Sequence, residues 1–165
     1  MPFVMETKGI DELLRKLEKT EGAARGIAAQ ALYEGAGVVA DEISKKAAGL
    51  KTKIVKFPMR DGQRMPSPEE KAIVTGQGAA GIAKFKFNGT TVDTSIGYSR
   101  SGYATAPWNG KQVPIAKIAN AINHGTSFMK KQPFIRQAIS RSQKRALAAI
   151  EKTAEELVAN LFKSA

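Results

Sequence analysis

Apolar residues recur at helical spacing over the first third of the chain. From Ile10 to Ile43 they return every three or four positions, which predicts a long amphipathic helix. Lysines and a glycine between Lys46 and Gly49 predict where that helix ends. Glycines also lie inside the stretch, beginning with Gly22, and each destabilises a helix by about 1 kcal/mol relative to alanine. We therefore expect either a break near Gly22 or a close approach to another helix, from this chain or from a neighbouring subunit.

The end of the chain carries the same pattern. Pro133 suits the first turn of a helix, and apolar residues follow it at helical spacing as far as Leu161. A second long helix is therefore predicted there. At the opposite end of the chain, residues Phe3 to Glu6 predict a short edge strand.

Two short helices are predicted between the long ones. Ser67 has the character of an N-cap, Pro68 suits the first helical position, and two acids follow in the first turn. This helix is expected to end near Val74. The other short helix is expected to open at Pro114, to place four apolar residues on one face, and to close at Gly125.

Strict alternation of apolar and polar residues predicts two strands in the middle of the chain. It runs over residues 82–87 and again over 92–98, on either side of Asn88-Gly89. Asn-Gly is the strongest short hairpin signal, because both residues tolerate positive φ. A β-hairpin is therefore predicted, followed by a polar, glycine-containing loop over 99–112.

The predicted elements define an α+β fold. We expect one domain over residues 1–165, in which two long helices, N- and C-terminal, pack on a small antiparallel sheet built around the hairpin, with short connecting helices. A lone hairpin is marginally stable in water, so the sheet is expected to gain strands from elsewhere in the chain or from a neighbouring subunit. Residues 50–67, which are rich in Lys and Arg and contain two prolines, predict an irregular and flexible insertion.

Positive charge is concentrated in one part of the chain. The formal net charge is +11, and residues 71–150 hold twelve Lys and Arg but a single acid, Asp93. Such asymmetry predicts a polyanionic neighbour, either nucleic acid or an acidic protein face. A basic surface that only keeps the chain soluble is the alternative.

Basic residues of this stretch are the candidate contacts for such a neighbour. Lys84 and Lys86 alternate with phenylalanines on the first hairpin strand, so both project from one of its faces. No helix-turn-helix or other base-reading element is recognisable, but phosphate contact needs only Lys or Arg beside the backbone. The candidates for contact with DNA or with an acidic partner are Lys84, Lys86, Arg100, Lys111, Lys130 and Lys131.

The sequence offers no constellation for catalysis, cofactor binding or metal binding. There is no cysteine, and the only histidine, His124, adjoins Gly125, where it suits a helix cap. Residues 76–81 match the dinucleotide motif G-x-G-x-x-G, but a strand follows them where that motif requires a helix. We therefore expect no enzyme activity and no cofactor. No signal-peptide pattern opens the chain and no apolar run approaches the roughly 18 residues of a membrane span, so a cytoplasmic protein is expected.

Several short motifs occur in a fixed order along the chain. Gly9-Ile10-Asp11-Glu12 opens the first predicted helix, and Thr75-Gly76 precedes the hairpin. Asn123-His124-Gly125-Thr126-Ser127 is followed by Gln132-Pro133-Phe134, which opens the last helix. In this order the motifs resemble those of the phage neck proteins, small siphophage proteins known as tail-completion, head–tail joining or minor tail components.

The resemblance implies a structural virion protein that joins the tail to the head. Copies of the chain are expected to form a ring, a hexamer, between the head-side connector or stopper protein and the tail terminator or tail-tube protein, with DNA passing through. The expected location is the virion neck, and the host cytoplasm during assembly, with no membrane contact. A nonspecific nucleic-acid-binding protein that uses a basic surface is the alternative.

Four residues of these motifs are expected to be structural. The Gly125-Thr126 pair supplies a turn, which a Cβ at Gly125 would obstruct. Pro133 fixes where the last helix begins, and Phe134 anchors that helix on the sheet. Nothing in the family's pattern marks a catalytic site.

Overall fold

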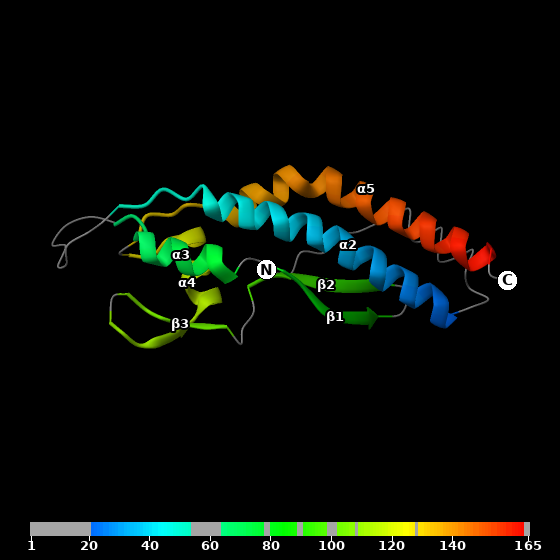
Figure 1. Cartoon of the computed structure of the whole chain (residues 1–165), viewed down its shortest axis with the longest axis horizontal. Helices are drawn as coiled ribbons and strands as arrows, with labels where there is room; N and C mark the ends of the chain where they lie inside the picture. Colours follow the sequence, from blue (N-terminus) through cyan, green and yellow to red (C-terminus); the bar gives the residue numbers. More distant parts are fainter. Residues whose placement is uncertain are drawn as a thin grey trace. The chain divides into compact units, whose positions relative to one another are not determined.

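The computed structural model shows four helices and four strands among the residues that it describes (Figure 1). The described residues are 21–53, 64–77, 80–88, 91–98, 102–107, 109–127 and 129–163. The predicted edge strand at Phe3–Glu6, any break before Glu21, and Arg100 lie outside them. The elements are α2 (Glu21–Ala48), α3 (Pro68–Gln77), β1 (Ala80–Asn88), β2 (Thr91–Gly97), β3 (Tyr103–Thr105), β4 (Gln112–Pro114), α4 (Ile115–His124) and α5 (Phe134–Lys163).

The helices predominate, and the described strands form two separate two-stranded sheets. β1 pairs with β2, so the predicted hairpin is confirmed in its strands. β3 pairs antiparallel with β4, with Ala104 opposite Val113 at the centre of the register. The prediction of a loop over 99–112 is wrong for β3 and for the first residue of β4. These strands have three residues each, which is too few to show a clear alternation.

The predicted ends of the helices agree with the structure to within a few residues. α2 ends at Ala48, and Gly125 closes α4. α5 begins at Phe134, directly after the proline that was expected to open it. α3 runs past its expected end at Val74 as far as Gln77.

The chain divides into two compact units. Unit 1 comprises Met1–Val39, Gly81–Ile96 and Ser142–Ala165, and unit 2 comprises Ala40–Ala80 and Gly97–Arg141. Each long helix contributes one part to each unit, because α2 passes into unit 2 after Val39 and α5 passes into unit 1 after Arg141. The single domain expected from the sequence stays a prediction.

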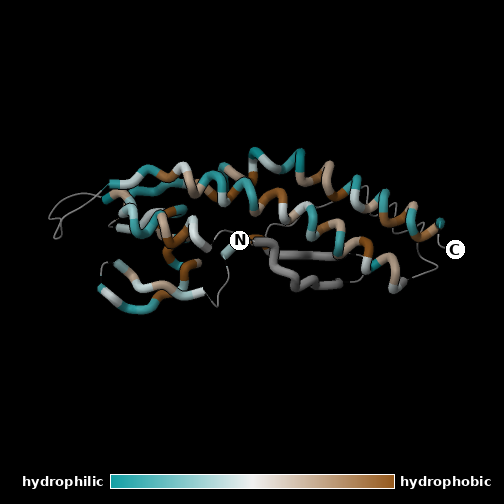
Figure 2. Tube along the Cα trace, in the orientation of Figure 1, coloured by the Kyte–Doolittle hydropathy of each residue, from teal (hydrophilic) through white to brown (hydrophobic). Residues whose placement is uncertain are grey.

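In unit 1 the buried faces of α2 and α5 meet. A core cluster joins Ala31 and Leu32 of α2 to Ile150 and Ala154 of α5, with Ile27 packed against it. Hydrophobic and hydrophilic residues alternate in bands along both helices (Figure 2), as expected of helices that bury one face.

Gly35 lies where these two helices approach closely. A Cβ added there would lie 2.4 Å from Cγ1 of Ile150 and 3.2 Å from the carbonyl oxygen of Ala146. The expected close approach of another helix is therefore confirmed, and that helix is α5 of the same chain. Gly26 and Gly37 would meet no described atom within 4 Å, and α2 is continuous through all three glycines.

In unit 2, α3 packs against α4, and α4 packs against β4. The expected apolar face of α4 is confirmed, because its four apolar residues are buried, namely Ile115, Ile118, Ala119 and Ile122. The large apolar side chains with the least exposure in this unit are Ile43, Val74, Ile118 and Ile122.

Candidate interaction surface

The loop between α4 and α5 begins at Gly125 with a backbone conformation that only glycine adopts readily. Its φ is 77° and its ψ is 168°. A Cβ there would also lie 3.0 Å from Cβ of Lys131 and 3.1 Å from the carbonyl oxygen of Met129. Both the torsion angles and the available space therefore favour glycine, as expected of a turn that a Cβ would obstruct.

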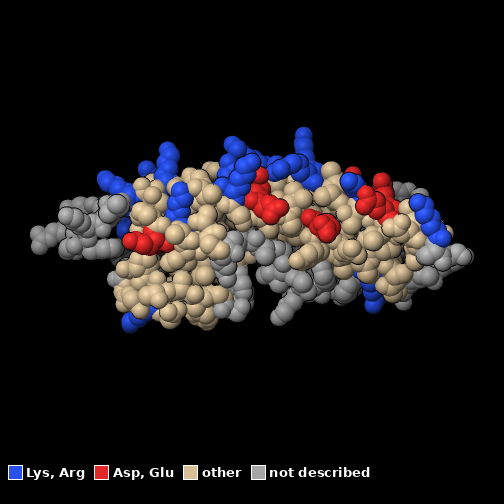
Figure 3. Space-filling model, in the orientation of Figure 1, with Lys and Arg blue, Asp and Glu red and all other residues tan. Residues whose placement is uncertain are grey.

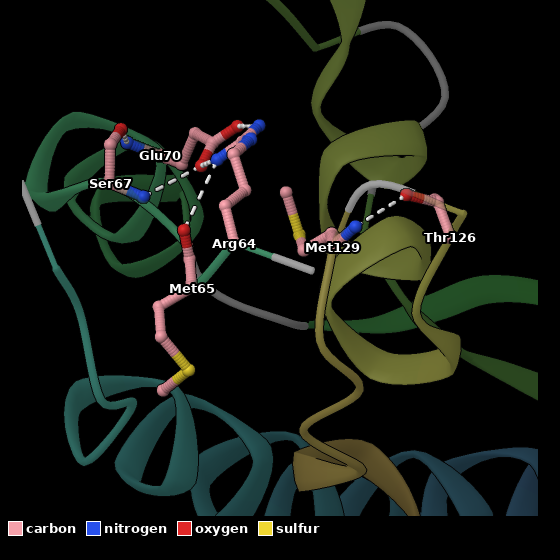
Figure 4. A network of polar contacts seen from close by, with 6 residues as sticks. All are labelled: Arg64, Met65, Ser67, Glu70, Thr126 and Met129. Carbon is pink, nitrogen blue, oxygen red and sulfur yellow. Dashed lines mark hydrogen bonds and ion pairs between the residues drawn. The ribbon is translucent and has the colours of Figure 1, made fainter. Parts of the chain in front are cut away.

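Thr126 closes this loop with two hydrogen bonds. Its backbone N–H donates to the carbonyl oxygen of Met129 at 3.0 Å, and the N–H of Met129 donates to Oγ1 of Thr126 at 3.0 Å (Figure 4). The main chain of Met129 also forms an isolated parallel β-bridge with Arg64. The loop is thereby attached to the segment that precedes α3.

The last turn of α4 holds the beginning of α5. Asn123 is buried, and its Oδ1 accepts a hydrogen bond from the N–H of Ile135 at 3.0 Å. The carbonyl oxygen of Ile122 accepts one from the N–H of Gln132 at 2.8 Å. His124 ends α4 on the surface, with its Nε2 3.3 Å from Nδ2 of Asn123. These residues therefore join two helices.

Pro133 and Phe134 stand at the junction of this loop with α5. The carbonyl oxygen of Pro133 accepts a hydrogen bond from the N–H of Gln137 at 3.1 Å, which begins the hydrogen bonding of the helix. Phe134 is 3 % exposed. That Phe134 packs on a sheet stays a prediction.

A buried ion pair joins Arg64 to the first turn of α3 (Figure 4). Nη2 of Arg64 lies 2.6 Å from Oε1 of Glu70, and Nη1 lies 2.7 Å from Oε2. The side chain of Glu70 is fully buried and that of Arg64 is 12 % exposed. Hydrogen bonding to Glu70 raises the pKa of Arg64 against the opposing effect of burial. The guanidinium therefore compensates the buried carboxylate.

Ser67 and Glu70 also form a capping box at the start of α3. The N–H of Glu70 donates to Oγ of Ser67 at 3.1 Å, and the N–H of Ser67 donates to Oε2 of Glu70 at 2.7 Å. Two amides at the helix start are satisfied in this way. The N-cap predicted at Ser67 is confirmed.

Three segments that are distant in sequence meet beside this ion pair, and we call them the three-segment junction. The N–H of Lys53 donates to the carbonyl oxygen of Pro66 at 3.1 Å. The N–H of Lys130 donates to the carbonyl oxygen of Arg64 at 2.8 Å. The junction comprises residues 51–53, 64–66 and 129–132.

The side-chain amide of Gln132 completes the junction. Its Oε1 accepts a hydrogen bond from the N–H of Lys51 at 3.0 Å, and its Nε2 donates to the carbonyl oxygen of Lys51 at 2.9 Å. One glutamine therefore satisfies both backbone groups of Lys51. The two described ends of the insertion predicted over 50–67 are both hydrogen-bonded into the junction, and its irregular and flexible character stays a prediction. Residues 54–63 lie outside the described residues.

The six candidate contact residues are divided between the two units. Lys84 and Lys86 lie on β1 in unit 1, but the structure does not describe their side chains. Arg100 lies outside the described residues. The other three are exposed side chains of unit 2, namely Lys111, Lys130 and Lys131. Of these three described side chains, Lys130 and Lys131 belong to the junction.

Lys51 and Lys53 are exposed residues of the same junction that were not among the predicted contacts. From the sequence both belonged to the irregular insertion, whereas in the structure the backbone of Lys53 is bonded to Pro66 and that of Lys51 to Gln132. The two amino acids that form this link are 81 positions apart. No local pattern signals a contact of that range.

Exposed positive charge is concentrated in unit 2. Among its described residues nine Lys and Arg side chains are exposed, against two exposed acids, Asp41 and Glu69. In unit 1 the described exposed side chains include five basic and four acidic ones. On the face that Figure 3 shows, Lys and Arg gather over the end of α2 and the beginning of α5. The charge asymmetry of the sequence is therefore an asymmetry between the units.

The described part of the chain offers little other chemistry. It contains no group of three or more His, Asp or Glu side chains that could hold a metal ion. None of its helices is long and apolar enough to cross a membrane. Comparison of the chain with protein-family models, with curated proteins and with solved structures finds no match. The function therefore has to follow from the residues themselves.

Proposed function

We propose that the chain is a structural virion protein of the phage neck, which forms a ring with copies of itself, joins the tail to the head-side connector and allows DNA to pass. The role of the motif residues carries the proposal. Gly125 and Thr126 shape a loop, and Asn123 beside them holds the first turn of α5. These residues build a framework and present no reactive group, which is what the resemblance to neck proteins implies.

The strands of unit 1 support assembly with further copies. β1 and β2 form a two-stranded sheet among the described residues, and an isolated pair of strands is marginally stable in water. Unpaired strand edges are templates for pairing with another chain. In the proposed ring, α2 and α5 pack on the hairpin sheet and a neighbouring subunit extends it.

The proposed ring has a protein partner on each side. The head-side partner is the connector or stopper protein, and the tail-side partner is the tail terminator or tail-tube protein. Its place is the virion neck, after assembly in the host cytoplasm. Catalysis and cofactors have no part in this function, which consists of matching protein surfaces.

Light scattering and negative-stain imaging of the purified full chain test the ring. We expect the mass of a hexamer and annular particles, either alone or after mixing with the connector and tail-tube proteins. Hydrogen exchange provides an independent readout, because amides on the outer edges of β1 or β2 gain protection when a neighbouring strand pairs with them. The proposal would be refuted if the chain stayed a monomer in every mixture and the hydrogen exchange of the amides in β1 and β2 did not change.

Nonspecific nucleic-acid binding is the second candidate function. The nine exposed basic side chains of unit 2, against two exposed acids, favour it. It predicts tight binding to unrelated DNA sequences, with an affinity that falls steeply as salt rises. Binding that is only micromolar or weaker at physiological salt would remove this candidate.

A further inference from the structure

We propose that unit 2 carries a binding surface for the phosphate backbone of double-stranded DNA, made of Lys51, Lys53, Lys130 and Lys131. We call these four residues the lysine platform. The inference rests on the second candidate function and deepens it, because it names the four of the nine exposed basic side chains of unit 2 that meet the phosphates. It does not require the ring, since an isolated subunit would carry the same platform.

The backbone beneath the platform is fixed by hydrogen bonds. Lys51 is held through both of its main-chain groups by the side chain of Gln132 at 3.0 and 2.9 Å. The N–H groups of Lys53 and Lys130 are bonded to Pro66 and Arg64. The backbone of three of the four lysines is therefore already in place, and a preorganised backbone lowers the entropic cost of association.

The charge of the platform is not compensated by the carboxylate of the neighbouring ion pair. Glu70 is fully buried and is engaged by Arg64 at 2.6 Å. Within the described ranges, no ion pair involves any of the four lysines, all of which are exposed. No acid of the described residues therefore neutralises these four charges.

The surroundings of the platform favour phosphate over an acidic protein face. The large hydrophobic side chains that are exposed among the described residues are Tyr33, Tyr103 and Phe162, and none belongs to the junction. Protein–protein interfaces are enriched in aromatic residues at their core and depleted in lysine. Phosphate oxygens, in contrast, are bound by Lys together with polar side chains, and the junction also contains the half-buried Thr52.

Duplex DNA is the polyanion that this platform suits best. It presents one negative charge per about 1.7 Å of helix axis, so several lysines can each meet a phosphate. No described element has the form of a base-reading motif, so binding should not depend on sequence. The expected ligand is therefore the sugar–phosphate backbone of any duplex.

Fluorescence anisotropy with two labelled duplexes of unrelated sequence tests the platform. The four platform lysines are changed to glutamine together in the full chain. A matched control removes the same charge at four exposed lysines elsewhere, by Lys117→Gln, Lys144→Gln, Lys152→Gln and Lys163→Gln. A third variant changes the four platform residues to arginine, which keeps the charge. Circular dichroism checks that each variant is folded.

The inference predicts how the affinity for DNA depends on salt concentration. Four neutralised phosphates contribute a slope of about −3.6 to the plot of log affinity against log salt, or about a 100-fold loss between about 50 and 200 mM. The wild type, the control and the arginine variant should show this loss on both duplexes. The platform variant should lose most of the slope.

Three outcomes would overturn the inference. Equal loss in the platform and control variants would mean that total charge alone decides binding. An unchanged slope in the platform variant would place DNA on another surface, which keeps the second candidate function while removing the platform. Stronger binding of a poly-glutamate peptide than of DNA would assign a protein partner instead. None of these outcomes bears on whether the ring forms.

Discussion

The carboxylate of Glu70 is fully buried and accepts three hydrogen bonds. Two come from Arg64 at 2.6 and 2.7 Å, and one comes from the N–H of Ser67 at 2.7 Å. A buried charge is tolerated when it is both paired and hydrogen-bonded, and this carboxylate meets both conditions. A single side chain thereby starts α3 and fixes the end of the segment that carries Arg64.

Removing one member of this pair should be costly. We expect Arg64→Met to lower the free energy of unfolding by about 3–5 kcal/mol, because Glu70 is left buried without its cation. Urea unfolding, monitored by circular dichroism, measures this change in the free energy of unfolding. Lys152→Met is the control, since Lys152 is exposed and its nitrogen lies 3.9 Å from Glu156. The double variant Arg64→Met, Glu70→Leu should recover much of the loss. A small effect of Arg64→Met alone would contradict this account.

Tyr98 has the opposite character, because its buried hydroxyl has no hydrogen-bond partner among the described residues. The residue is 6 % exposed. Burial raises the pKa of Tyr98 to about 12, whereas a tyrosine in an unfolded chain ionises near about 10. The unfolded state therefore loses this proton first as pH rises.

The stability that depends on neutral Tyr98 should be complete below about pH 10 and decline between about pH 10 and 12. Tyr98→Phe should remove this part of the pH dependence. At neutral pH the same change should be neutral or slightly stabilising, because it deletes an unsatisfied hydroxyl. Urea unfolding of both proteins at several pH values measures the difference. If the free energies of unfolding of the wild type and Tyr98→Phe change in parallel from about pH 9 to 12, ionisation of Tyr98 does not cause the loss of stability.

At the scale of elements, small residues accompany the close approach of α2 and α5 in unit 1. Ser142 and Ala146 are fully buried on α5, and the carbonyl oxygen of Ala146 lies 3.2 Å from the position of a Cβ added at Gly35. The sequence does not mark Ser142 or Ala146 as core residues, because alanine and serine are common on either side of a helix. Gly35 on α2 completes the close contact in unit 1.

Gly35→Ala should destabilise the protein by about 1–3 kcal/mol, because the new methyl group would overlap Ile150. Gly37→Ala is the matched control, since no described atom lies within 4 Å of its Cβ position. That control should stabilise α2 by up to about 1 kcal/mol. Thermal unfolding measures both variants. Adding Ile150→Ala should make the cost of Gly35→Ala much smaller, and strict additivity of the two changes would refute the contact.

The turn at Gly125 permits a similar comparison. Gly125→Ala should cost at least about 1–3 kcal/mol through its torsion angles, and more through the contact with Lys131. Gly110 also has a positive φ, of 66°, but no described atom lies within 4 Å of its Cβ position. Gly125→Ala should therefore cost more than Gly110→Ala in chemical denaturation, because its φ of 77° and ψ of 168° lie in a region nearly confined to glycine and the new methyl group would also meet Lys131. Equal costs would contradict this account of the turn.

At the scale of the whole molecule, periodicity predicted the elements but not their connections. The spacing of apolar residues indicated α2, α4 and α5, and alternation indicated the first hairpin. α3 extends through Thr75 and Gly76, which are poor helix formers, and it packs against α4. The platform could not be predicted, because hydrogen bonds between residues 51 and 132 bring its lysines together.

The two compact units should unfold together. α2 and α5 each run without interruption through both units. If one unit unfolds, the parts of these helices that belong to the other unit lose the turns that continue them. We expect one cooperative transition. Arg64→Met in unit 2 should therefore speed hydrogen exchange at Ala31 and Leu32 in unit 1. Mass spectrometry of peptides from both units measures this, and faster exchange confined to unit 2 would show that the units unfold separately.

The junction should also hold the fold together when the main chain is cut between Lys53 and Arg64. The main chain leaves it at Lys53 and returns at Arg64, and hydrogen bonds hold both ends where they stand. A cut within that interval would yield two fragments that still meet through α2 and α5. Separately expressed halves should therefore associate into one particle, which size-exclusion chromatography of the mixed halves would show.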